Sequence, residues 1–203
     1  MSTEFKTAAS RVENILTKEK GSKFIGYLFP VSTEEEVQGA LSEIKALHPK
    51  ATHHCYAYRL GLEGEIYRAN DDGEPSGSAG LPIYNQLLSA GITNVILVVV
   101  RYYGGTKLGV SGLVKAYKES AILTLEECKI VTRQLESLVQ IQFPFASQNV
   151  IFTVLNKLQA KVLQFDADQS CKITARINFS QKDDISNQFA KMPSVQFEIE
   201  DLL

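Results

Sequence analysis

The sequence has few cysteines, and Cys55, Cys128 and Cys171 lie far apart in the chain. Their odd number and wide spacing exclude a disulfide framework and a CxxC metal motif, so we expect a cytoplasmic protein. Long apolar runs are also missing. The longest, Val95 to Val100, is far shorter than the roughly 20 residues that cross a bilayer. Because the N-terminus also shows no secretory signal, we expect no membrane partner.

The sequence also has no large excess of positive or negative charge, since it contains 21 Lys and Arg and 23 Asp and Glu. This balance excludes a globally basic nucleic-acid binder, but it leaves room for a local basic patch. The apolar share of 44% is typical of a globular protein, and 203 residues allow one large or two small domains.

The predicted elements divide the chain into two domains of an α+β protein. Residues 1–133 mix strands and helices, beginning with strands at Arg11 to Leu16 and Lys23 to Phe29. Residues 134–203 follow the order βαββαβ, which is the ferredoxin-like unit. We place the boundary near Val131 to Glu136, although no Gly- or Pro-rich linker marks it.

Three helices are predicted in the first domain. The first begins in a capping-box segment, Ser32 to Glu36. The apolar stripes of the three helices are, in chain order, Val37, Ala40, Leu41 and Ile44; Leu81, Tyr84, Leu87 and Leu88; and Val114, Tyr117, Ala121 and Leu125. The apolar segment Asn94 to Arg101 predicts a strand that is buried on both faces.

A glycine-rich loop connects this strand to the third helix and is the main candidate site. Glycines let backbone N–H groups approach an anion, and a helix N-terminus adds positive potential. We therefore expect phosphate or nucleic-acid binding by Arg101, Tyr102, Tyr103, Gly104, Gly105, Lys107, Gly109, Gly112 and Lys115. The alternative is a tight turn that needs glycine only for its backbone geometry.

An acidic loop is the second candidate, because Asp71, Asp72 and Glu74 are followed by the hydroxyls of Ser76 and Ser78. Clustered carboxylates can hold a hard cation or act as general acid and base. The alternative is a solvated turn in which Ser78 caps the next helix.

Two other patterns carry less chemistry. His53 and His54 are neighbours on a predicted strand, so their side chains point to opposite faces, and we expect no metal there. Tyrosines and arginines are interleaved along the strands and would form a stacking platform for bases if they shared an exposed face. They are Tyr56, Tyr58, Tyr67, Tyr102 and Tyr103 with Arg59, Arg68 and Arg101.

Taken together, the segments 53–55, 71–80, 99–105 and 108–117 resemble the signatures of the bacterial YigZ-like branch of the IMPACT family. The resemblance implies a two-layer first domain like domain IV of elongation factor G and a second domain like its domain V. It offers no catalytic residues. Eukaryotic members regulate translation initiation, using an additional domain that is not seen in this sequence.

We therefore expect a protein without a cofactor that binds RNA or a ribosome-associated partner. The alternative is an enzyme acting on a phosphorylated small molecule or nucleotide at the glycine-rich loop, residues 101–112, with Asp71, Asp72 or Glu74 as acid, base or Mg²⁺ ligand. A protein-binding regulator of translation is a third possibility. The oligomeric state is not predicted.

Overall fold

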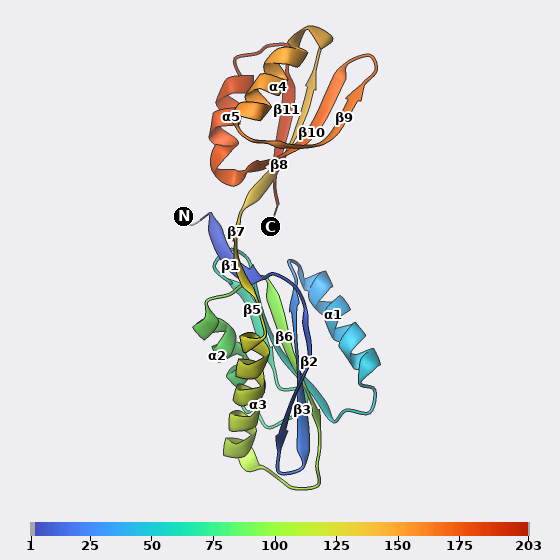
Figure 1. Cartoon of the computed structure of the whole chain (residues 1–203), viewed down its shortest axis with the longest axis vertical. Coiled ribbons are helices and arrows are strands. Elements are labelled where there is room, and N and C mark those ends of the chain that lie inside the picture. Colours follow the sequence, from blue (N-terminus) through green and yellow to red (C-terminus); the bar gives the residue numbers. More distant parts are fainter. Residues whose placement is uncertain (1–2, 203) are drawn as a thin grey trace. The chain divides into compact units, whose positions relative to one another are not determined.

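The computed structural model describes residues 3–202, which form two compact units. The first unit consists of residues 5–133, and the second of residues 134–202 together with Thr3 and Glu4 (Figure 1). No helix within residues 3–202 is long and apolar enough to cross a membrane.

The first unit contains a five-stranded antiparallel sheet in the order β2-β3-β6-β4-β5. Its strands are β2 (Val12–Glu19), β3 (Ser22–Pro30), β4 (His53–Leu60), β5 (Ile66–Asn70) and β6 (Val95–Tyr102). The apolar strand β6 lies at the centre and is buried on both faces, as the sequence predicts.

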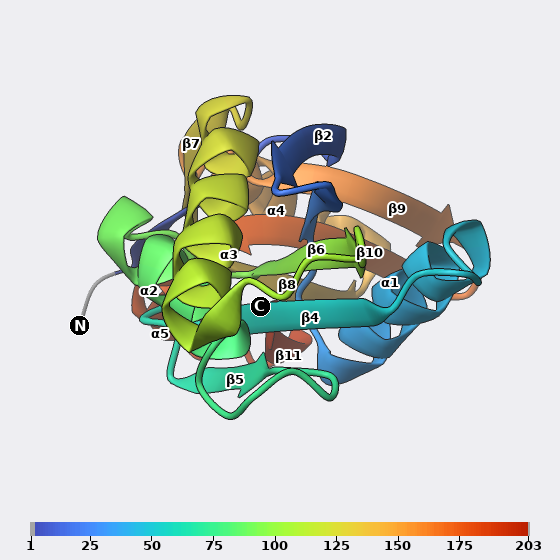
Figure 2. The same ribbon diagram turned by 90° about the horizontal axis from the view of Figure 1, so that it is seen from below.

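Helices cover both faces of this sheet, so the expected two-layer arrangement is wrong. The helices α2 (Gly80–Ala90) and α3 (Gly109–Glu126) lie on one face, and α1 (Glu34–Leu47) lies on the other (Figure 2). The alternation along β6 explains the difference, since Leu97 packs in the cluster with α2 and α3, whereas Val98 packs with α1. A strand that is apolar at every position needs cover on both sides.

The apolar stripe of α1 is confirmed, and its N-cap is Thr33, whose hydroxyl accepts from the backbone N–H of Glu36. The stripe predicted for α2 is partly wrong, because Leu81 and Leu88 are exposed. Its buried face is instead formed by Gly80, Pro82, Ile83 and Leu87. Gly80 packs so closely on the backbone of Asn70 that a Cβ there would lie 2.4 Å from the Asn70 nitrogen, which places this face of the helix against β5.

Two short strands were not predicted from the sequence. The strands β1 (Glu4–Ala8) and β7 (Ile130–Gln134) pair in a separate two-stranded sheet. Four of the five β7 residues are exposed, so the strand has none of the apolar alternation by which strands are recognised.

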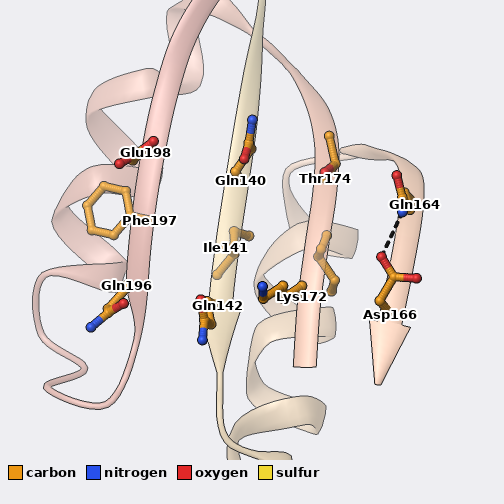
Figure 3. Close-up of a pocket in the computed structure, with 11 residues that line it drawn as sticks. Gln140, Ile141, Gln142, Gln164, Asp166, Lys172, Thr174, Gln196, Phe197 and Glu198 are labelled. Carbon is orange, nitrogen blue, oxygen red and sulfur yellow. Dashed lines mark hydrogen bonds between the residues drawn. The ribbon is translucent and has the colours of Figure 1, made fainter. Parts of the chain in front are cut away.

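The second unit confirms the predicted order βαββαβ. Its elements are β8 (Glu136–Phe143), α4 (Gln148–Lys157), β9 (Lys161–Ala167), β10 (Cys171–Asn178), α5 (Lys182–Phe189) and β11 (Gln196–Leu202). The four strands form their own antiparallel sheet in the order β11-β8-β10-β9. Ile141 and Ile173 face the core with α4 and α5, whereas Gln140, Lys172 and Thr174 line the open face (Figure 3).

Candidate functional site

The acidic loop folds around the side chain of Asp71. Asp71 Oδ1 accepts from the backbone N–H groups of Ala79, at 3.0 Å, and Gly80, at 2.8 Å, while Oδ2 accepts from Gly77 at 2.8 Å. Asp71 therefore caps α2, and the expectation that Ser78 does so is wrong. The buried hydroxyl of Ser78 donates to the carbonyl of Pro75 instead. The carboxylate oxygens of Asp71 are occupied by the loop itself.

Glu74 and Arg101 form a buried ion pair, with 2.6 Å between Oε1 and Nη1. The two side chains are only 4% and 6% exposed, and Glu74 Oε1 also accepts from the hydroxyl of Tyr117 at 2.8 Å. Arg101 therefore presents no free charge to an anion, contrary to the sequence prediction. The reason is burial, because a charged group inside a protein needs an opposite charge, and the acidic loop supplies it.

Cys55 and Tyr117 extend this buried cluster. Cys55 Sγ lies 3.0 Å from the carbonyl oxygen of Asp71 and 3.2 Å from the Tyr117 hydroxyl. Burial raises the pKa of the Cys55 thiol and the pKa of the Tyr117 hydroxyl. Both groups thus keep their protons at neutral pH, and Cys55 acts as a packing and hydrogen-bonding residue rather than a nucleophile.

The two histidines point in different directions, as strand geometry predicts. His53 Nδ1 lies 2.7 Å from the carbonyl oxygen of Asp72, so Nδ1 carries the proton and Nε2 faces Glu74 Oε1 at 3.8 Å. His54 Nε2 lies 3.2 Å from the carbonyl oxygen of His48, and burial lowers its pKa.

The remaining residues of the acidic loop form no metal site. Asp72, at a positive φ of 43°, accepts from the backbone N–H of His54, and the side chain of Ser76 is exposed. Among residues 3–202, no group of three or more His, Cys, Asp or Glu side chains could hold a metal ion.

The glycines of the second loop serve different purposes. Gly104 packs against the β2–β3 turn, where a Cβ would lie 2.0 Å from the carbonyl carbon of Gly21, and its N–H donates to the hydroxyl of Ser22. Gly112 lies within α3 beside Leu108. Only Gly105 and Gly109, with positive φ of 86° and 70°, have open space around them. Two of the four glycines are thus free to approach a ligand.

The amino end of α3 lies beside these open glycines. No side chain caps this helix of 18 residues, and Gly109, Val110 and Ser111 are exposed. Lys107 and Lys115 are also exposed, and neither forms an ion pair with any described residue. An uncapped helix N-terminus with nearby lysines is an anion-accepting arrangement.

Three further lysines, which were not predicted as site residues, belong to the same end of the first unit. Lys18 and Lys23 are direct cross-strand partners in the β2–β3 hairpin, and Lys20 occupies its turn. All three are exposed, and the hairpin turn lies at the same end as the amino end of α3 (Figure 1). The signal was the lysine-rich segment 18–23. Together, these three lysines, Lys107, Lys115 and the first turn of α3, residues 109–111, form the basic end of the first unit.

The predicted tyrosine platform does not form. Tyr56 and Tyr58 are buried under α1, and the hydroxyl of Tyr102 is bound to His48 Nδ1. Tyr67 stacks on Tyr84 of α2. Of the predicted set, Tyr103 is the exposed tyrosine at the basic end, where its hydroxyl donates to the carbonyl of Gly105.

Comparison with known proteins assigns the family. The model of the Impact N-terminal domain matches residues 20–125, slightly more than half of the chain and most of the first unit. This chain belongs to the IMPACT family. The matched segment includes the acidic loop, Arg101 and the start of α3.

Bacterial members of the IMPACT family are similar to this chain. The family member YvyE of Bacillus subtilis is 46% identical over 56% of this chain and 52% of its own length. YigZ of Escherichia coli is 43% identical over 48% of this chain and 49% of its own. The chain thus spans about half the length of these curated relatives. A crystal structure of a hypothetical protein matches 97% of both chains, with 27% identity and a TM-score of 0.74.

Proposed function

We propose that this IMPACT family protein binds single-stranded RNA through the basic end of its first unit. The observation that carries the proposal is the cluster of exposed lysines, unpaired among the described residues, around the uncapped start of α3. RNA phosphates would accept hydrogen bonds from the backbone N–H groups of residues 109–111 and would neutralise the lysines.

The direct pairing of Lys18 with Lys23 supports a polyanionic ligand. Like charges on opposite strand positions repel and lower the stability of the free protein. A bound phosphate chain removes that repulsion. The exposed ring of Tyr103 adds a surface on which an unpaired base can stack.

An extended ligand fits this end better than a small phosphorylated molecule does. The charges are spread over a hairpin, a loop and a helix, whereas Arg101 and Gly104, which would have completed a compact cradle, are used within the protein. Asp71 and Glu74 are likewise engaged. The family resemblance implies ribosomal RNA as a source of such a strand, and with it a role in translation.

Fluorescence anisotropy with an end-labelled single-stranded RNA of about 20 nucleotides tests this function over a range of salt concentrations. Each phosphate contact contributes about 0.7 to the slope of log K against log salt for single strands. We expect the triple variant Lys20→Ala, Lys23→Ala, Lys107→Ala to bind more weakly and to lose about 2 from that slope.

The matched control is Lys157→Ala, Lys172→Ala, Lys191→Ala, which removes the same charge from the second unit. It should leave the slope unchanged. Equal slopes for both folded triple variants and the wild type would contradict binding at the basic end.

A further inference from the structure

The strand β9 forms one edge of the sheet in the second unit, and its outer side has no strand partner among the described residues. All seven of its residues are exposed, including the apolar side chains of Val162, Leu163 and Phe165. An exposed edge strand with apolar side chains is a template for pairing with another strand.

A bulge sets the directions of the β9 side chains. Phe165 lies opposite Ile173 and Val162 opposite Ala175, and both of these β10 residues are buried in the core with α4 and α5. Asp166 lies opposite Lys172 on the open face (Figure 3). Lys161 lies opposite Arg176, which alternates along β10 with the buried Ala175 and Ile177 and so belongs to the same open face. The register shift between Thr174 and Ala175 makes Leu163 the extra residue.

We propose that β9 pairs with β9 of a second copy of this chain, antiparallel and about a twofold axis between Leu163 and Gln164. In this register, Lys161 lies opposite Asp166 of the second copy, and Val162 lies opposite Phe165 of the second copy. Each interaction occurs twice. The strand sequence from Lys161 to Asp166 is therefore complementary to itself in charge and in apolar character.

The bulge is what permits this register. Paired residues in an antiparallel sheet share a face, and in a regular strand Lys161 and Asp166 would lie on opposite faces. The extra residue Leu163 brings them to the same face, and it does the same for Val162 and Phe165. Asp166 Oδ2 accepts from the amide of Gln164, which leaves Oδ1 for the lysine of the second copy.

Charge reversal tests the pairing in the full-length chain by sedimentation velocity from about 1 µM to 1 mM. We expect the wild type to show a concentration-dependent monomer–dimer equilibrium. Lys161→Asp and Asp166→Lys each place like charges opposite one another twice, so each should weaken dimerisation at least about tenfold. An equimolar mixture of the two variants, and the double variant Lys161→Asp, Asp166→Lys, should dimerise again. Lys191→Asp, an equal charge change away from the edge, is the control.

Restored dimerisation in the mixture requires the two positions to face each other between copies. A wild type that is monomeric at 1 mM would overturn the proposal and leave the edge to a strand of another protein. A dimer that is equally stable in both single variants would overturn it as well, because the contact would then lie elsewhere.

Discussion

The carboxylate of Glu74 and the guanidinium of Arg101 meet inside the first unit, at 2.6 Å, with almost no exposure of either side chain. The pair joins the acidic loop to β6. Tyr117 of α3 donates its hydroxyl to Glu74, so α3 is connected to the same pair. Two segments that look like separate sites in the sequence thus form one structural cluster.

Removing one member of this pair should destabilise the first unit strongly. We expect Arg101→Ala to lower the free energy of unfolding by about 3–5 kcal/mol, because Glu74 keeps a buried charge without its partner. The double variant Glu74→Leu, Arg101→Met should regain much of this loss. Urea unfolding followed by circular dichroism measures both. A single variant as stable as the wild type would show that the pair does not hold the loop.

Asp71 should matter for stability through its backbone acceptors. Its carboxylate accepts hydrogen bonds from three backbone N–H groups, two of them at the start of α2, and we expect Asp71→Ala to cost about 2 kcal/mol of unfolding free energy. Asp71→Asn keeps one accepting oxygen and should lose less. Ser76→Ala, in the same loop but exposed, is the control and should unfold like the wild type. Equal stability of Asp71→Ala and Ser76→Ala would contradict the capping role.

The elements with a strong apolar pattern could be predicted from the sequence, and those without one could not. The continuous apolar run of β6 and the periodicities of α1 and of the βαββαβ tail were sufficient to predict these elements, whereas β7 is almost wholly exposed and has no such pattern. The site was harder to predict because its charges form pairs across long separations. Nothing in the local sequence shows that Arg101 meets Glu74, 27 residues away, or that Gly104 packs on Gly21.

Stability should fall as the pH drops below about 6.5. The hydroxyl of Tyr27 donates to Asn14 Oδ1, so it accepts from His48 Nε2, and His48 Nδ1 accepts from the hydroxyl of Tyr102. Burial lowers the pKa of His48 and of His54 in the folded protein. The unfolded chain, with the ordinary value near 6.5, therefore binds more protons as the pH falls, which favours unfolding.

Urea unfolding of the wild type and of His48→Gln at pH 7.5, 6.5 and 5.5 measures this effect. The wild type should lose more stability on acidification than the variant does. Parallel losses would show that His48 does not contribute.

The central claim is that RNA is bound at the basic end, and hydrogen–deuterium exchange with and without a 20-nucleotide single-stranded RNA tests it directly. Bound phosphates should slow the exchange of backbone amides in residues 103–112 and 18–23, because those N–H groups or their neighbours contact the ligand. We expect protection there and little change in β4 or α1. Protection confined to residues 134–202, or no protection at saturating RNA, would contradict the account.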